Sequence, residues 1–393
     1  MRAVGTISRG IRAPIIKKGD DLAEIVAGSV IEAAKKDGFS LHDRDIVGVT
    51  ESVLARSQGN YATITQIAAD VRKKFPGGTI GVTLPILSRN RFSQILRGIS
   101  IGAEKLYIQL AYPGDEVGNP LMSWDMLDEK GINPYVDVLE EDEFTNLFGK
   151  VVHPFTGVNY ISYYKELACG KATIIFGNDP RAILKYTKHV ITADIHTRHR
   201  SKKLLRSAGA ETVFGIDELL TVPLEGSGYN PQYGLLGSNL ATEDSLKLFP
   251  RDAQAFAERV AARLLSLTGK NIEVLVYGDG AFKDPVRGIW ELADPVVSPG
   301  YTKGLEGTPN ELKLKYLADT AAGDKHGEAA SEVIRDLIRK KQDNLVGDMI
   351  SQGTTPRRLT DLLGSLCDLT SGSGDKGTPI ILVQGYFDTY ADE

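Results

Sequence analysis

Apolar and polar positions alternate along the first third of the chain with two periods, one typical of helices and one of strands. Residues 20–38 carry apolar side chains at helical spacing, with acidic residues in the first turn and a Lys-Lys-Asp-Gly ending, which predicts a helix. The further elements predicted in this part are strands over 45–50, 79–85 and 105–112 and helices over 61–75 and 90–103. This order predicts an α/β fold and argues against an all-β fold or a helix bundle.

The regular alternation stops after Pro113. Residues 113–165 are rich in Asp, Asn, Pro and aromatic residues, and we expect them to be irregular. A compact β-α-β-α-β unit follows, with strands predicted over 171–177, 189–195 and 211–215 and helices over 180–187 and 200–209. The last predicted elements are a loop over 224–239, a helix over 251–269, a strand over 271–277, a mostly helical part and a final strand within 378–387.

Composition narrows the class of protein. The 393 residues are 42% hydrophobic and 25% charged, as in ordinary soluble globular proteins. A net charge of -5 gives no electrostatic reason to expect nucleic-acid binding. No run approaches the ~20 apolar residues of a membrane span, and the first residues lack the apolar core of a signal peptide. We therefore expect a cytoplasmic protein without a membrane partner, in which Cys169 and Cys367 are reduced thiols.

The strand predicted over 271–277 leads into a segment with an unusual density of charge, "YGDGAFKDPVRG". Asp279, Lys283, Asp284 and Arg287 follow one another within nine residues. Asp-Gly and Asp-Pro pairs are typical of turns, so a plain turn is one interpretation. The other is a site, because ligands bind at the carboxyl ends of α/β strands and carboxylates there can hold Mg²⁺ or Mn²⁺ on nucleotide phosphates.

Three more segments could carry chemistry, and each also has a plain structural interpretation. The acidic segment "PGDEVGN" (113–119), which contains Asp115, follows another predicted strand. "TADIHTRHRSKK" contains Asp194 and His196, which could form an anion or metal site or could begin a solvated helix. "SRNRFSQILRG" contains three arginines, Arg89, Arg91 and Arg97, which could be ordinary surface cations.

A glycine-rich loop, Gly372-Ser-Gly-Asp-Lys-Gly377, matches G-x-G-x-x-G. The dinucleotide fingerprint needs a strand before this motif and a helix after it, and here the predicted order is inverted. The sequence also contains no P-loop motif. The loop could still present backbone N–H groups to a phosphate, with Ser371, Ser373, Asp375 and Lys376 around it, or could be a flexible turn.

Five segments together resemble the gamma-glutamyl ligase family of coenzyme F-420 biosynthesis, and they keep the order of that family. The segments are "APIIKKGDDLAEIV", "DRDIVGVTESVLARSQGN", "GDEVGN", "YGDGAFKDPVRG" and "LTSGSGDKGTPIILVQG". The resemblance covers roughly residues 1–120 and 270–390. It implies a ligase core in two parts, 1–120 and 269–393, and an insertion over 121–268 that contains the small β-α-β-α-β unit.

The resemblance also implies a reaction: GTP phosphorylates a carboxylate acceptor such as coenzyme F-420-0, and the amine of L-glutamate attacks the acyl phosphate. Mn²⁺ or Mg²⁺ would be the metal, with K⁺ as a further candidate ion. The implied metal ligands are Asp115, Asp279 and Ser373, and the implied catalytic residues are Asp279, Lys283 and Arg287. The implied nucleotide-binding residues are Ala13, Pro14, Ile15, Ile16, Ser52, Arg56, Asn119, Ser371, Gly372, Gly374, Asp375, Lys376 and Gly377.

The chain departs from the family's pattern at several positions. Arg56, Gln58 and Gly280 stand where the family has a lysine, a glutamate and a hydroxyl residue, and Ser373 stands at a metal-binding glutamine. We expect the insertion to bind the acceptor through Arg198 and Arg200, or else to be a dimerisation element of a homodimer. The alternatives are a non-catalytic regulatory homologue, an amide ligase with another acceptor, and an oxidoreductase or nucleotide sensor. The last is disfavoured because "IIFGNDPRAI" lacks the glycines of a dinucleotide site.

Overall fold

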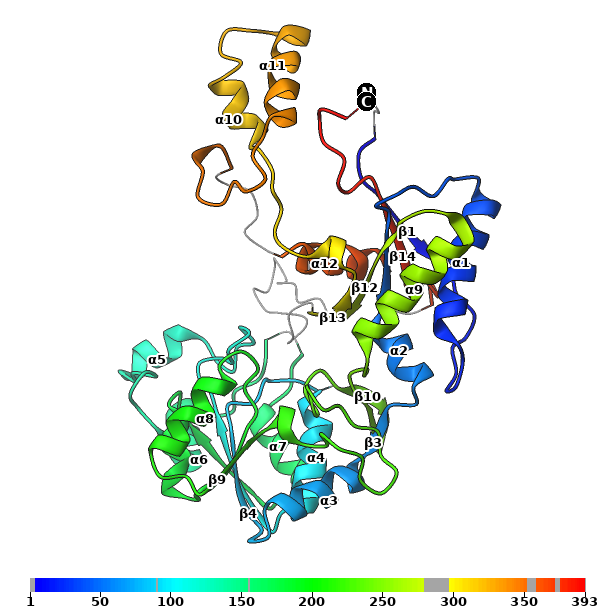
Figure 1. Ribbon diagram of the computed structural model, residues 1–393. Coiled ribbons are helices and arrows are strands. Elements are labelled where there is room, and N and C mark those ends of the chain that lie inside the picture. Colours follow the sequence, from blue (N-terminus) through cyan, green and yellow to red (C-terminus); the bar gives the residue numbers. More distant parts are fainter. Residues whose placement is uncertain are drawn as a thin grey trace.

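The computed structural model describes residues 4–89, 91–154, 156–278, 297–351, 358–371 and 375–392. Within them the chain builds a five-stranded, a six-stranded and a small three-stranded sheet. Figure 1 shows the two larger sheets in separate parts of the molecule, with a helical arm projecting from the part that contains the five-stranded sheet. The predicted α/β fold class is confirmed.

The five-stranded sheet joins the two ends of the chain. Its strands, in spatial order, are β1 (Ile7–Ile11), β14 (Ile380–Gln384), β2 (Ile46–Thr50), β12 (Glu273–Gly278) and β13 (Val297–Tyr301). β2 and β12 are parallel, and the other neighbours are antiparallel. Helices α1 (Leu22–Asp37) and α9 (Ala253–Thr268) cover one face, and α12 (Leu359–Ser371) covers the other.

Alternation along these strands explains the three layers. Val47 and Val49 of β2 pack in the cluster formed with α1 and α9, whereas Ile46 packs in the cluster formed with α12. Gly48 also faces α12, where a Cβ atom would lie only 2.5 Å from the sulfur of Cys367. Since both faces are covered, the strand reads as a nearly continuous apolar run.

The six-stranded sheet forms the second body. Its strands, in spatial order, are β6 (Leu139–Glu140), β7 (Ala172–Phe176), β5 (Lys105–Leu110), β4 (Thr79–Thr83), β8 (His189–Thr192) and β9 (Thr212–Gly215). All neighbours are parallel except β6 and β7. The helices of one side include α3 (Ile64–Lys74), α4 (Phe92–Gly102) and α7 (Tyr160–Leu167), and those of the other are η1 (Pro180–Lys185) and α8 (Arg198–Ser207).

Helices α3 and α4 pack closely because α4 carries glycines at i and i+4. A Cβ atom at Gly98 would lie 2.5 Å from a methyl carbon of Ile67, and one at Gly102 would lie 2.8 Å from Val71. Both glycines therefore sit on the face that contacts α3.

The sheets group the chain differently from the predicted division. The strands of the predicted β-α-β-α-β unit do not form a sheet of their own, because β7 pairs with β5 and β8 pairs with β4. The predicted boundary at residue 120 thus falls within one sheet, whose strands run from residue 79 to residue 215. Parallel strands need a crossover between them, and α4 and α7 supply crossovers on one face.

A three-stranded sheet and a short helix lie between the two bodies. The sheet consists of β10 (Asn239–Thr242), β11 (Ser245–Lys247) and β3 (Tyr61–Thr63), and the helix is α2 (Glu51–Ser57). β3 is the start of the segment predicted as a helix over 61–75. The capping box of Thr63 and Gln66 begins the helix α3 one residue later.

The segment 113–165, expected to be irregular, contains regular elements. They are α5 (Trp124–Lys130), β6, α6 (Glu141–Phe148) and the first part of α7. α5 begins at the N-cap Ser123 and ends at Gly131, which has a positive φ of 66°. The helix predicted over 180–187 is the 3-10 helix η1.

The projecting arm contains α10 (Leu314–Asp319) and α11 (Gly327–Arg339), which share a small apolar cluster with Leu345 and Ala391. The remaining short 3-10 helices are η2 (Ile216–Glu218), η3 (Lys303–Leu305) and η4 (Met349–Ser351). Near the two ends of the described chain, the hydroxyl of Thr6 donates to the carbonyl of Gly385 at 3.5 Å. Among the described residues, no helix is both long and apolar enough to cross a membrane.

Candidate functional site

Four segments that are far apart in the sequence meet at one edge of the five-stranded sheet. Ile11 at the end of β1 is opposite Ile380 at the start of β14, and Ile380 is also opposite Val49 of β2. Tyr277 of β12 is opposite Thr50. The C-terminal ends of β1, β2 and β12 and the N-terminal end of β14 therefore lie at the same side of the sheet. We call this side the first edge.

Backbone hydrogen bonds connect these segments. The N–H of Ala13 donates to the carbonyl of Gly377 at 3.2 Å, and the N–H of Thr50 donates to the carbonyl of Pro379 at 3.0 Å. Predicted nucleotide-binding residues from both ends of the chain are thus neighbours. Ile16 is buried in the core and Ile15 is exposed, so the two can offer a ligand different groups.

A groove of about 680 Å³ lies beside these segments and is mostly basic. It is lined by residues of β1, α1 and the segment before β14, and its cations are Arg9, Arg12, Lys36 and Lys376. Arg9 donates to Gln384 at 2.6 Å, and Lys36 is paired with Glu32 at 2.6 Å. Among the described residues, neither Arg12 nor Lys376 forms an ion pair with an acidic side chain. Two cations are therefore free for an anionic ligand.

A buried ion pair lies at the same edge, and the sequence did not point to it. Glu51 follows β2 directly and is only 3% exposed. Lys247 of β11 places its Nζ 3.3 Å from Glu51 Oε1 and donates to the hydroxyl of Ser52 at 2.6 Å. Gly278, the last residue of β12, lies against Glu51, where a Cβ atom would clash with the glutamate side chain. The feature of the sequence that could have indicated this pair is a glutamate directly after a strand predicted to be buried.

Helix α2 ends in two polar residues with different surroundings. Arg56 is exposed at its last turn. Gln58 exchanges two hydrogen bonds with the backbone of Arg251, at 2.6 and 2.9 Å. The glutamine that stands at a family glutamate therefore ties α2 to the segment before α9.

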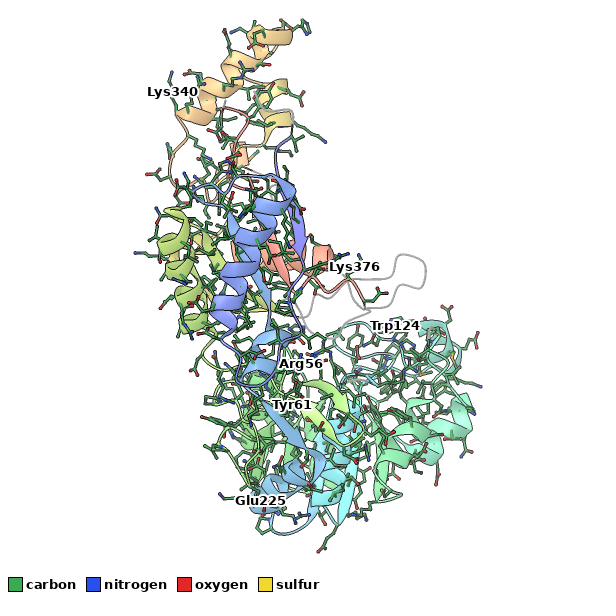
Figure 2. The ribbon with its side chains drawn as sticks, turned by 90° about the vertical axis from the view of Figure 1, so that its right-hand side faces the viewer. Arg56, Tyr61, Trp124, Glu225, Lys340 and Lys376 are labelled. Carbon is green, nitrogen blue, oxygen red and sulfur yellow. The ribbon has the colours of Figure 1, made fainter. Side chains whose placement is uncertain are left out.

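The carboxyl ends of the parallel strands of the six-stranded sheet form a second edge. Figure 2 shows Lys376 in the upper part, Trp124 of α5 in the lower part and Arg56 of α2 between them, where the two parts meet. α5 follows the turn after β5 in the sequence. Trp124 of α5 therefore marks, in Figure 2, the side of the sheet at which β5 ends.

Asp115 lies at the second edge, in the turn after β5, and its carboxylate is fully engaged. Oδ1 accepts from the N–H groups of Val117 and Asn119, at 3.1 and 2.8 Å. Oδ2 accepts from the N–H of Leu87 and from the side chain of Asn119, both at 2.8 Å. Burial raises its pKa, and these donors act in the opposite direction.

Glu116 connects two of the sequence segments singled out above. Its carboxylate accepts from the backbone N–H groups of Ile195, His196 and Thr197, at the start of α8. The segments "GDEVGN" and "TADIHTRHR" are therefore in direct contact. The acidic side chain fills the donors of this helix start, as expected for the positive end of a helix dipole.

Asp194 is the second residue after β8 and is fully buried. Its Oδ2 accepts from Thr197 and Ser201, at 2.7 and 2.8 Å. Its Oδ1 is buried without a partner among the described residues. Burial raises the pKa of Asp194, and the negative charge of Glu116 raises it further.

The protein-family model of the F420-0:gamma-glutamyl ligases matches residues 10–385. The chain belongs to this family. The match extends over both sheets and includes the middle of the chain. No protein in a curated set matches the chain. The family is one of ligases that act on small molecules.

In this ligase, three residues that were predicted to contact ligands use their side chains for contacts within the protein. Asn119 is buried, and its side chain donates to Asp115. Arg198 is buried, lies 2.8 Å from Asp217 and donates to the carbonyls of Asp194 and Ile195. The hydroxyl of Ser371 donates to the carbonyl of Asp368 at 2.8 Å. Arg200, by contrast, is exposed on α8.

Several predicted site residues of the ligase lie outside the described residues. They are Asp279, Lys283, Asp284, Arg287, Gly372, Ser373 and Gly374. Within the described parts of the chain, no group of three or more His, Cys, Asp or Glu side chains is placed to hold a metal ion. A further cavity of about 490 Å³, between residues 308–314 and 386–390, contains none of the predicted site residues.

Proposed function

We propose that this ligase forms an amide between L-glutamate and a carboxylate acceptor, with coenzyme F-420-0 as that acceptor, and that GTP drives the reaction. The family match supports the class of reaction. The convergence of four terminal segments at the first edge is the observation that carries the nucleotide assignment. Such an edge is the usual ligand position in open α/β sheets.

The nucleotide would lie along the segments around residues 13–16, 50–56 and 375–377. Arg12 and Lys376 would offset the charge of its phosphates, because cations beside a phosphate are stabilising when no acid already neutralises them. Lys247, next to Glu51 and Ser52, would hold the hydroxyl of Ser52 in place. Lys283 and Arg287 are proposed to steady the transferring phosphoryl group.

The chemistry has two steps. A carboxylate oxygen of the acceptor attacks the γ-phosphorus of GTP, which gives an acyl phosphate and GDP. The amine of glutamate then attacks the acyl carbon, inorganic phosphate leaves, and the amine loses a proton. What the protein contributes is mainly orientation and charge stabilisation.

A divalent ion would supply charge neutralisation at the phosphates. Asp115 does not fit as its ligand, because an ionised carboxylate has about four lone-pair sites and each Asp115 oxygen already accepts two hydrogen bonds. We therefore assign Mn²⁺ or Mg²⁺ to the segment after Gly278, which begins with Asp279. In this proposal Asp115 has a structural role and does not contact the metal ion or the substrates.

The test is GTP consumption by the full-length protein, with glutamate and F-420-0 added singly and together. We expect GDP only when both are present, and loss of GTP binding in excess chelator, as measured by calorimetry. Asp279→Ala should lower turnover by about 100-fold or more and leave the thermal unfolding midpoint unchanged. GTP binding without turnover by the wild type would favour the regulatory homologue instead. Light scattering of the same sample tests the proposed homodimer.

A further inference from the structure

The six-stranded sheet has a strand order with a known consequence for ligands. In chain order its parallel strands are β4, β5, β7, β8 and β9, and in space they lie in the order β7-β5-β4-β8-β9. This is the order 3-2-1-4-5 of dinucleotide-binding folds, in which ligands bind where the strand order reverses. Here the reversal lies between the carboxyl ends of β4 and β8.

The turn after β4 lacks the glycines of a dinucleotide site. It reads "LPILSRNR", and its residues Pro85, Ile86 and Leu87 are buried. A backbone of this kind cannot approach a pyrophosphate as a glycine-rich turn does. The turn instead exposes a cation, Arg89, near the start of α4. This turn is therefore better suited to bind a single anionic group through the side chain of Arg89 than to bind a dinucleotide.

The turn that leads to Arg89 is held by a connected set of hydrogen bonds. The N–H of Leu87 donates to Asp115, and the N–H of Ser88 donates to the hydroxyl of Tyr164 at 3.2 Å. That hydroxyl donates to the carbonyl of Ile86 at 2.7 Å. Asp115 is thus a positioning residue for the turn that carries Arg89. A fixed turn reduces the entropy lost when Arg89 binds a ligand.

The charge of Arg89 is not neutralised by the protein. Among the described residues, no acidic side chain pairs with Arg89, whereas Arg198 at the same edge is paired with Asp217. Arg89 is also near enough to His153 for its charge to act there: burial lowers the pKa of His153, and Arg89 lowers it further. His153 is therefore neutral at pH 7.

His153 adds a directed hydrogen-bond donor. Its Nδ1 accepts from the N–H of Thr156 at 3.2 Å, so the proton of the neutral ring is on Nε2. The ring is only 3% exposed and packs edge-on against Tyr160, with centroids 5.8 Å apart. Within the described chain, Nε2 has no hydrogen-bond partner. Its N–H can thus donate to a ligand.

Two further buried polar atoms at this reversal point lack partners. They are Oγ1 of Thr83, the last residue of β4, and Oδ1 of Asp194, the second residue after β8. Both residues are fully buried. Buried polar atoms in native proteins nearly always have a partner, so a water or a polar group is expected beside each of these two atoms.

We propose that the second edge is the acceptor site of this ligase, and that Arg89 and the Nε2–H of His153 bind an acidic group of F-420-0. The inference rests on the proposed function, since it places the acceptor opposite the nucleotide edge. It replaces Arg198 and Arg200 as the acceptor contacts. The acceptor then approaches GTP from the six-stranded sheet, while the nucleotide stays on the five-stranded sheet.

The experiment is calorimetric titration of the full-length protein with F-420-0 and, separately, with GTP. Arg89→Met should weaken F-420-0 binding by about 10- to 100-fold, the effect of one charge-assisted hydrogen bond, and should not change GTP binding. Arg89→Lys, which keeps the charge, should recover part of the loss. The control is Arg181→Met, an exposed arginine of the same sheet that is already paired with Asp179. It should change neither affinity.

His153 is tested by two variants that each keep one of its nitrogen positions. His153→Gln can keep a donor near Nε2 and should retain most of the F-420-0 affinity. His153→Asn can keep the acceptor for Thr156 and should lose affinity several-fold. Circular dichroism tests whether both variants are folded. If one of them is unfolded, the inference is tested by Arg89→Met and Arg89→Lys instead.

Each outcome separates the inference from the proposed function. F-420-0 binding that is equal in the wild type and Arg89→Met overturns the inference but leaves the proposed function open. A wild type that does not bind F-420-0 overturns both the inference and F-420-0 as the proposed acceptor. A loss of GTP affinity in Arg89→Met would move Arg89 to the nucleotide site and also overturn it. A wild type that binds F-420-0 through Arg89 but never consumes GTP would overturn the proposed function alone.

Discussion

The edges of the two large sheets both collect polar residues at strand ends, but they use them in different ways. At the first edge, Arg12 and Lys376 flank a groove and have no acidic partner within the described chain. At the second edge, Asp115, Glu116 and Arg198 are engaged by backbone groups or by an opposite charge. The comparison teaches that a polar cluster after a strand can be an open site or a closed network of internal contacts.

The difference follows from what each edge must satisfy. Turns after parallel strands leave backbone N–H groups that need acceptors when they are buried. At the second edge, Asp115 and Glu116 supply those acceptors. The exposed groove at the first edge can use water for the same purpose. The oxygens of a buried carboxylate thus often accept hydrogen bonds from the protein itself and are not available to a ligand.

The largest effect is expected at a buried contact of the first edge, the pair of Glu51 and Lys247. Lys247→Met would leave the carboxylate of Glu51 in a buried position without this cation. We expect the free energy of unfolding to fall by about 3 kcal/mol, since removing one partner of a buried ion pair is strongly destabilising. Urea denaturation measures the change.

Two further variants sharpen this first prediction. Glu51→Gln combined with Lys247→Met should recover part of the lost stability, because neither charge then remains buried. Lys270→Met is the control, since Lys270 is exposed and forms only a surface pair with Asp43. A loss for Lys270→Met as large as that for Lys247→Met would show that the burial of the pair does not matter.

The second prediction addresses the basic helix start of the second edge. Arg198→Met removes the ion pair with Asp217 and two hydrogen bonds to carbonyls. We expect a loss of about 2 kcal/mol in the free energy of unfolding, whereas Arg200→Met should change it by less than about 0.5 kcal/mol. Thermal and urea denaturation give both values.

This pair of variants also tests the sequence-based acceptor assignment. If Arg198 is structural, the folded Arg198→Met protein binds F-420-0 as the wild type does. A weaker affinity for F-420-0 in either variant, with unchanged stability, would restore the two arginines as acceptor contacts and break the contrast between the edges.

Most elements of the fold could be predicted from the sequence, because their periodicity is local. The helix predicted over 20–38 is α1, and the strands predicted over 45–50 and 105–112 are β2 and β5. The pairing of β4 with β8 could not be predicted. It joins segments about a hundred residues apart, and both are apolar runs that would fit several neighbours.

The short helices of the segment 113–165 were missed for another reason. α5 and α6 are seven and eight residues long, which is too short for a clear helical period. The available signals were local: a serine N-cap at Ser123, a C-cap glycine at Gly131 and three acidic residues in the first turn of α6.

For the candidate site, the sequence indicated segments better than it indicated individual roles. Segments around residues 13, 50 and 377 do meet at one edge. The role of Asp115 depends on donors from Leu87 and Asn119, and the first of these is 28 residues away. Arg89 was noted only as a possible surface cation. Its neighbours His153 and Tyr164 come from a part of the chain that the pattern did not resolve.

The smallest effect is expected for the buried carboxyl group of Asp194, and it is a dependence on pH. Because burial raises the pKa of Asp194 in the folded protein, its contribution to stability is complete below the unfolded pKa and is lost as the pH rises through the folded pKa. At pH 7 the wild type therefore carries the cost of a buried charge, and Asp194→Asn does not. Asn can still accept from Thr197 and Ser201 through one oxygen.

The stability of Asp194→Asn relative to the wild type should thus be highest at pH 7. It should decline by about 1 kcal/mol as the pH is lowered through the folded pKa of Asp194, which lies above 3.8. Urea denaturation of both at several pH values between 4 and 7 gives the difference. A difference that does not vary with pH would mean that Oδ1 of Asp194 has a partner in solution, and that this part of the second edge is closed as well.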